Sequence, residues 1–231
     1  MILAYRKVMF KLGLVFKLLL VFTPWTVRRR LLKIFFGYDL HPTSRIGLAW
    51  VFPRSLKMGC RAQIASTTIF RNVDEIIIGC DSSIGRLNYF TGYPLNGPAY
   101  AHEATRQSAL FLGSHAAITS RHFFDCTNKI SIGDFSTIGG LRSQFLTHSI
   151  DFDLCVQRSD RISIGCYSFV GTSVIVLSGS FLPDYSVLGA GSLLNSHLTQ
   201  PSMLYAGSPA RAVRQVRDAC GYFVRSEGFV P

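Results

Sequence analysis

The chain has 231 residues, with 24 Lys and Arg against 13 Asp and Glu, which gives a formal charge of +11. A chain of this length can bury a core without the disulfides or metals that very small domains need. The charge predicts an anionic partner, either a phosphorylated ligand or a membrane surface. Nucleic acid is disfavoured as that partner, because no nucleic-acid-binding motif is present and the aromatic residues fall at expected core positions.

Residues 1–43 form a segment rich in Leu, Phe and Val that is interrupted by lysines and by the run Arg28 to Arg30. Its apolar run from 8 to 22 is shorter than the roughly 20 residues that span a bilayer, and no signal-peptide cleavage site follows it. We expect a basic amphipathic helical arm that binds the anionic cytoplasmic face of the inner membrane. The alternative is an arm that caps the first coil of the domain or packs on a neighbouring subunit.

Aliphatic residues recur at every sixth position in the second half of the chain. They are Ile164, Val170, Val176, Leu182, Leu188 and Leu194. A period of six matches neither a helix nor a surface strand, and it is typical of a parallel β-helix whose aliphatic side chains point into a prism. The chain is thus expected to be an all-β solenoid.

The same period occurs earlier in the chain, with slips. Ile46, Phe52, Met58, Ile64 and Phe70 are expected to point inward, followed by the series that starts at Ile78, at Leu112 and at Ile132. We therefore predict a prism over 44–198, with a short tail over 199–231. Segments 91–109 and 145–161 break the period and are predicted to be extruded loops, which often carry function.

The six Cys residues show no CxxC spacing and no close pairing, and three of them directly follow a Gly of the repeat. We expect them to be small, reduced residues of the solenoid in a cytoplasmic protein.

From 161 to 216 the sequence resembles the hexapeptide-repeat acyltransferases. The resemblance is carried by "ISIGCYSFVGTSVIVLSGSFLPDYSVLGAGSLL" and by the closing motif "LYAGSPARAVRQV". It implies a left-handed parallel β-helix, a homotrimer, acetyl-CoA as co-substrate and no metal. It also implies transfer of an acetyl group to a hydroxyl of a sugar, in polysaccharide or glycolipid biosynthesis.

The family's catalytic His matches His148 in "LTHSIDFD". Imidazole suits a general base because its pKa lies near neutral pH. A carboxylate on its second nitrogen would fix the tautomer, and Asp151 is expected in that role, ahead of Asp153. The acceptor is expected to attack the thioester directly, because no activated Ser or Cys lies near His148 in the sequence.

The resemblance also implies four contacts to coenzyme A in the groove between adjacent solenoids of the trimer. They are Thr172, Ala190, Arg211 and Arg214. Guanidinium groups suit phosphate recognition. Many members of the family carry a Lys in the turn after the penultimate coil, whereas the corresponding turn here, "NSHLTQ", contains none.

The inserted segment "TGYPLNGPAYAHEATRQSA" has polar and aromatic groups suited to a sugar, namely Tyr93, Asn96, Tyr100 and His102, or it forms a trimer contact. With the arm, it suggests a lipid-linked or nucleotide-linked sugar as acceptor. Two alternatives stay open. One is a catalytically silent, membrane-anchored scaffold, and the other is a zinc-dependent hydratase that uses His115, His122 and His148.

Overall fold

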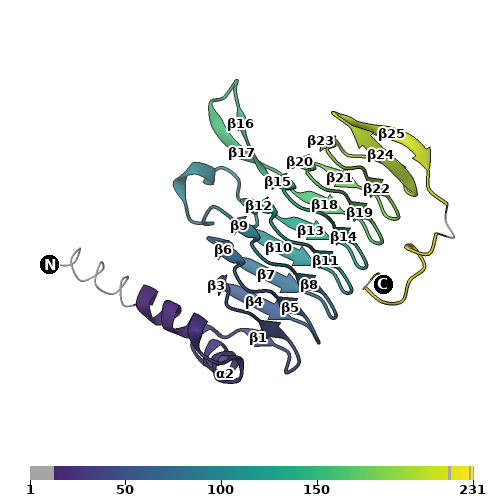
Figure 1. Ribbon diagram of the computed structural model, residues 1–231. Helices are drawn as coiled ribbons and strands as arrows, with labels where there is room; N and C mark the ends of the chain where they lie inside the picture. Colours follow the sequence, from purple (N-terminus) through teal and green to yellow (C-terminus); the bar gives the residue numbers. More distant parts are fainter. Residues whose placement is uncertain (1–12, 218–219, 229, 231) are drawn as a thin grey trace.

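The computed structural model describes residues 13–217, 220–228 and 230, and it is a three-sided prism of stacked coils (Figure 1). The coils contribute strands to three sheets, which we call A, B and C; the strands are parallel except for the last strand of sheet B, which is antiparallel to its neighbour. The predicted left-handed parallel β-helix is confirmed.

Sheet A contains, in spatial order, β1 (Asp39–Leu40), β4 (Ser55–Met58), β7 (Glu75–Ile78), β10 (Ala109–Leu112), β13 (Ile130–Ile132), β18 (Ile162–Ile164) and β21 (Phe181–Leu182). Sheet B contains β2 (Arg45–Ile46), β5 (Gln63–Ile64), β8 (Ser83–Ile84), β11 (Ala117–Ile118), β14 (Thr137–Ile138), β19 (Phe169–Val170), β22 (Val187–Leu188), β24 (Met203–Gly207) and β25 (Ala210–Gln215). Sheet C contains β3 (Trp50–Val51), β6 (Ile69–Arg71), β9 (Tyr89–Thr91), β12 (Phe123–Asp125), β15 (Gln144–Leu146), β20 (Ile175–Leu177) and β23 (Leu193–Leu194).

The core is a set of columns of identical or similar side chains, one above the other. Behind sheet C, the rings of Phe70, Phe90, Phe124 and Phe145 stack with successive centroid separations of 4.2, 4.6 and 4.5 Å. All six repeat residues from 164 to 194 are buried, as predicted. Because the coils stack in register, side chains of equal size meet and can pack closely along each column.

The structure explains the departures from the period of six. Strands of sheet A supply two inward side chains, as Ile76 and Ile78 do, so a coil with a full strand there is two residues longer. The inward residue of β3 is Val51, which lies opposite Phe70, and the expected inward Phe52 is only half-buried. The prediction for Phe52 was wrong because the turn before β3 is one residue shorter.

The arm closes the open end of the prism. A helix that includes residues 13–22 is followed by α2 (Trp25–Phe36), and Leu20 and Leu32 are buried against the core. Buried Arg28 donates hydrogen bonds to the carbonyls of Val21 (2.7 Å), Gly47 (2.8 Å) and Ile46.

The structure therefore shows the alternative in which the arm caps the first coil of the prism. The first strand, β1, begins at residue 39 and so precedes the expected start of the prism at 44. Among the described helices, none is both long enough and apolar enough to cross a bilayer.

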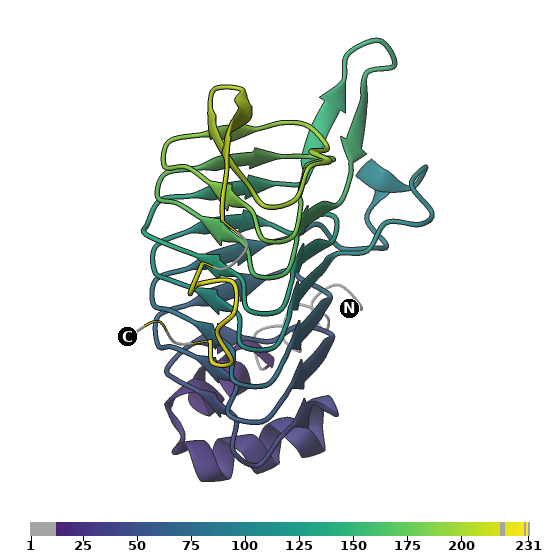
Figure 2. The ribbon, with the colours of Figure 1, turned by 90° about the vertical axis from the view of Figure 1, so that its right-hand side faces the viewer.

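Both insertions leave the prism at the corner between sheets C and A, which we call the C–A corner. The first covers 92–108 and includes the short helix η1 (Pro98–Tyr100). The second is a hairpin, β16 (His148–Asp151) with β17 (Val156–Ser159), where a loop was expected. Figure 2 shows both on the same side of the prism.

The tail returns along the A–B corner after β25 (Figure 2). Arg225 lies 3.8 Å from the ring centroid of Tyr222 and donates a hydrogen bond to the carbonyl of Phe135. The ring of Phe223 packs edge-on against Tyr185. All six cysteines are free thiols, as the sequence predicts.

Candidate active site

His148 is the first residue of the hairpin, where the chain leaves sheet C. Its Nδ1 lies 2.5 Å from Oδ2 of Asp125, and its backbone N–H donates to the same oxygen at 3.1 Å. The His148 side chain is about half exposed, whereas only 3% of the Asp125 side chain is exposed. The pair thus presents an accessible imidazole on a buried carboxylate.

The carboxylate of Asp125 is held from several sides. Its Oδ1 accepts hydrogen bonds from the backbone N–H of Thr127 (3.0 Å) and from the Thr127 hydroxyl (2.6 Å). The hydroxyl of Thr147 donates to the carbonyl of Asp125 at 2.7 Å. Since β12 and β15 pair in register, with Asp125 opposite Leu146, the backbone itself brings Asp125 beside His148.

The electrostatics follow from these contacts. Burial acts to raise the pKa of Asp125, but hydrogen bonds from His148 and Thr127 outweigh it and lower that pKa. The hydrogen bond to Asp125 raises the pKa of His148, and partial burial opposes it. With the Nδ1 proton directed at Asp125, the neutral ring carries its lone pair on Nε2. No described residue hydrogen-bonds to Nε2, since Asp125 contacts Nδ1.

The predicted partner of His148 is corrected by this geometry. Asp151 accepts hydrogen bonds from the Leu154 backbone N–H (3.0 Å) and from Nε of Arg158 (3.1 Å), so it stabilises the hairpin and does not contact His148. The second choice, Asp153, lies at the exposed tip. Asp125 was missed because it is 23 residues before His148 and only coil stacking joins them.

The loop 92–108 supports the hairpin. The Glu103 carboxylate accepts hydrogen bonds from the backbone N–H (2.7 Å) and hydroxyl (2.5 Å) of Ser159, which pairs with His148 across the hairpin. His102 Nε2 lies 2.8 Å from the carbonyl of Gln157. His102, expected near a sugar, therefore contacts the hairpin.

Aromatic residues fold the loop itself. The rings of Tyr93 and Tyr100 pack edge-on at 5.2 Å, and Tyr100 is buried. Arg106 lies over the Tyr100 ring at 4.7 Å and donates to the carbonyls of Tyr93 and Pro94 at 2.8 Å each. Of the four predicted sugar contacts, Asn96 and His102 are exposed, Tyr93 is half-buried and Tyr100 is buried.

Three of the four predicted coenzyme A contacts lie together at the B–C corner. A Cβ on Gly171 would lie 2.8 Å from the backbone N of Ala190, so the turns of Thr172 and Ala190 stack directly. Arg211 pairs with Ala206 across β24 and β25, and the side chain of Ala206 lies over Gly189, which directly precedes Ala190. Arg214 lies further along β25, in the wall of a cavity of about 620 Å³ at the tail end.

His148 and the B–C corner stand at opposite edges of sheet C. Thr172 Oγ1 bonds to the backbone of Leu141 at 2.9 and 3.0 Å, and 142–147 separate Leu141 from His148. Extended chain of that length covers roughly 20 Å. One chain therefore does not bring the two predicted subsites into contact.

The three histidines of the hydratase alternative do not converge. His115 lies at the A–B corner and stacks on Phe135. His122 is buried at the B–C corner, where burial lowers its pKa to about 4 and Thr119 Oγ1 lies 2.8 Å from Nε2. Within the described residues, no group of three or more His, Cys, Asp or Glu side chains is arranged to hold a metal ion.

Comparison with known proteins identifies similar folds and one similar sequence. No protein-family model matches the chain. The galactoside O-acetyltransferase of Escherichia coli is 35% identical over 57 residues, which cover 25% of this chain and 28% of that enzyme. The crystal structure of a mutant of AntD, an N-acyltransferase from Bacillus cereus, matches with a TM-score of 0.58 at 16% identity and covers 82% of this chain and 89% of its own.

The chain therefore shares the fold of AntD, and a quarter of its sequence is similar to the galactoside O-acetyltransferase. Both similarities support the family resemblance seen in the sequence. The chain spans about a quarter of the length of the curated relative that it matches. The AntD structure holds coenzyme A and dTDP-4-amino-4,6-dideoxyglucose.

We predict that Asp125→Asn lowers the pKa of His148, because the charged acceptor that favours the imidazolium is lost. A proton NMR titration of the histidine ring signals measures this directly. Asp151→Asn is the matched control and leaves the His148 titration unchanged. Equal shifts in the two variants would show that general charge, and not the Asp125 contact, sets the pKa.

Proposed function

We propose that this chain transfers an acetyl group from acetyl-CoA to a sugar hydroxyl in polysaccharide or glycolipid biosynthesis, with His148 as general base. The observation that carries the proposal is the His148–Asp125 pair, in which a half-exposed imidazole at the edge of sheet C bonds to a buried carboxylate. An acetyl transfer needs a base that removes the hydroxyl proton as the oxygen attacks the thioester.

The reaction follows from that geometry. Nε2 of His148 accepts the hydroxyl proton while the sugar oxygen bonds to the thioester carbonyl carbon. The carbon–sulfur bond then breaks, the acetyl ester forms, and the imidazolium returns the proton to the coenzyme A thiolate. Asp125 stabilises the imidazolium between these steps. Direct transfer fits the site, since no described Ser or Cys side chain hydrogen-bonds to His148.

The relatives support the choice of substrates. The similar segment of the galactoside O-acetyltransferase argues for a sugar hydroxyl, and the AntD complex argues for a coenzyme A donor and a sugar nucleotide or related acceptor. A catalytically silent scaffold would not need a half-exposed His on a buried carboxylate. The scattered histidines argue against the zinc hydratase.

We assign coenzyme A to the B–C corner. Thr172 and Ala190 would line the pantetheine arm, and Arg211 and Arg214 would bind the phosphates. Support comes from the stacking of the first two turns, with Arg211 next to them. Both arginines are exposed, and their guanidinium groups suit phosphate oxygens.

A homotrimer would unite the two subsites. The outer face of sheet C is a strip of apolar side chains, including Ile69 and Ile175 at 40% and 38% exposure and the stacked rings of Tyr89 and Phe123. A neighbouring copy on this face would carry its B–C corner toward His148. Cyclic assemblies use such heterologous contacts to form closed rings.

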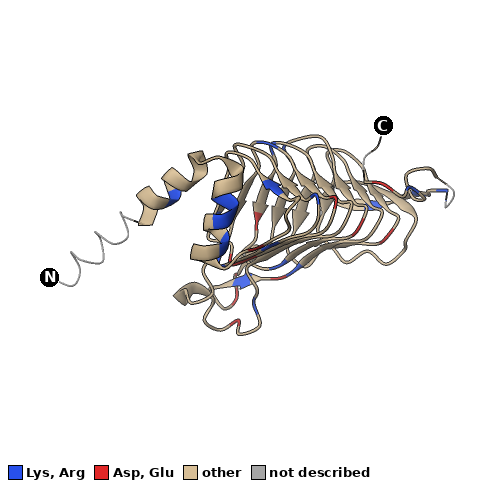
Figure 3. Ribbon diagram, turned by 90° about the horizontal axis from the view of Figure 1, so that it is seen from below, with Lys and Arg blue, Asp and Glu red and all other residues tan. Residues whose placement is uncertain are grey.

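We also propose that the protein is cytoplasmic and peripheral on the cytoplasmic face of the inner membrane. The arm buries one face on the prism, yet its outer face exposes Phe22 (73%), Ile34 (74%) and Phe35 (60%). End caps of solenoids need a polar outer face when they meet only water. The same helix α2 carries Arg29, Arg30 and Lys33 besides Ile34 and Phe35, and Figure 3 shows its basic residues, which favours anionic lipid.

His148→Ala is expected to reduce acceptor-dependent thiol release from acetyl-CoA by about 10²- to 10⁴-fold, since a positioned base is lost. The assay uses extracted lipid-linked and nucleotide-linked sugars as the acceptor pool. Coenzyme A binding is retained in the variant, and His41→Ala, at an exposed turn of the first coil, serves as control. Wild-type protein that binds no coenzyme A would contradict the proposal.

Subunit mixing tests whether each site spans two copies. Around a ring of three, a mixed trimer of His148→Ala and Arg211→Ala subunits has a single site with both residues intact, so activity recovers to about one third of wild type. Differently tagged subunits allow purification of the mixed species. Activity that stays at the level of the parent variants would show that each site lies within one chain.

Ile34→Glu is expected to lower binding to vesicles that contain anionic lipid by at least about tenfold, because an apolar contact worth about 1.5–3 kcal/mol is lost. Flotation of the full chain measures the bound fraction. Val213→Glu is the matched control, since Val213 is 59% exposed at the other end of the prism. Equal loss in both variants would refute binding through α2.

A further inference from the structure

A cleft of about 420 Å³ separates the arm from the first coils. Its walls are apolar on the side of Leu14, Trp50 and Phe52, and cationic where Lys17 and Arg71 enter it. A cleft with this lining suits an amphiphile that carries a phosphate, because the cations meet the phosphate and the apolar wall covers the chain.

The two cations are not neutralised by the protein. Lys17 Nζ lies 5.3 Å from the ring centroid of Phe52 and 5.9 Å from that of Phe36. Among the described residues, neither Lys17 nor Arg71 forms an ion pair. Residues 1–12 contain no Asp or Glu that could pair with them. Partial burial raises the pKa of Asp74, three residues after Arg71, and the cations that act on its carboxyl are Arg106 and Arg54.

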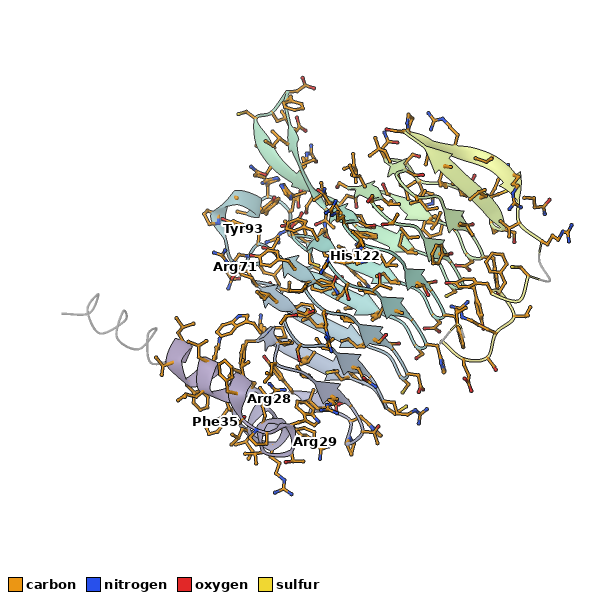
Figure 4. All side chains as sticks on the ribbon, viewed as in Figure 1. Arg28, Arg29, Phe35, Arg71, Tyr93 and His122 are labelled. Atoms are coloured by element: carbon orange, nitrogen blue, oxygen red, sulfur yellow. The ribbon has the colours of Figure 1, made fainter. Side chains whose placement is uncertain are left out.

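Arg71 stands in the same column of sheet C as Asp125. The register runs from Arg71 through Thr91 to Asp125 and then to Leu146, on adjacent parallel strands. At about 4.8 Å a strand, Arg71 lies roughly 10 Å below Asp125. One sugar ring and its linking phosphate can bridge that separation. Figure 4 shows Arg71 and Tyr93 on the same side of the prism, and the backbone N–H of Gly92, next to Tyr93, donates to the carbonyl of Arg71 at 3.0 Å.

We infer that this cleft binds the phosphate of a lipid-linked sugar acceptor, with Arg71 and Lys17 on the phosphate and the lipid chain along Leu14, Trp50 and Phe52. The inference rests on the proposed function and names its acceptor class. A phosphate held at Arg71 directs the attached sugar up the column toward His148. The lipid chain leaves along the arm, whose outer face is the proposed membrane contact.

The test is direct binding of farnesyl phosphate, below its micelle concentration, to the full chain. Trp50 lies in the cleft and Trp25 is the other tryptophan, so intrinsic fluorescence reports occupancy. Arg71→Ala is expected to weaken binding by about tenfold or more, as the loss of a hydrogen bond to a charged group would. Arg71→Lys retains part of the affinity, and farnesol binds weakly to all variants.

The controls separate the explanations. Arg45→Ala removes an exposed arginine on sheet B and leaves farnesyl phosphate binding unchanged. His148→Ala also binds as wild type does, so the cleft is tested even if transferase activity is absent. Unchanged affinity in Arg71→Ala, with loss in Ile34→Glu, would overturn the site in favour of the arm. Uridine diphosphate binding as tightly as farnesyl phosphate would overturn the lipid as the source of the phosphate.

Discussion

The structure depends on one constraint, which is that every coil pairs in parallel register with the coils above and below it. Hydrogen bonds between the coils fix the register, and inward columns such as the stacked rings of Phe70, Phe90, Phe124 and Phe145 penalise any slip, because a slip of one residue would turn each column outward. Turns and insertions then occupy fixed heights along the corners. The stacked coils therefore set the relative positions of side chains that are distant in the sequence.

The contact between the two residues of the candidate active site follows from this stacking of coils. Asp125 ends one strand of sheet C and His148 follows the next, so backbone pairing sets their contact before any side-chain preference acts. The insertion that starts after Thr91 supports the hairpin from below through Glu103. The same column continues down to Arg71, which relates the proposed phosphate position to the proposed base at a spacing set by strand pairing.

The two ends of the prism are closed differently. At one end the arm supplies apolar side chains to the core, and its Arg28 donates hydrogen bonds to the carbonyls of Ile46 and Gly47 in the first coil. At the other end β24 and β25 fold over the last coil. The first closure carries an apolar outer face and the second an arginine-rich strand, and these surfaces suit the proposed lipid and coenzyme A contacts respectively.

The sequence by itself determined the fold and pointed to His148, because a period of six and a short motif are local patterns. It also located both insertions. The tertiary structure decided which carboxylate meets His148: Asp151 is near in sequence but bonds to Arg158, whereas Asp125 is distant and arrives through coil stacking. It also decided that Val51 replaces Phe52 in the core. Both outcomes depend on the lengths of individual turns. A repeat pattern predicts only an average turn length, whereas the pairing of the strands shows the length of each turn.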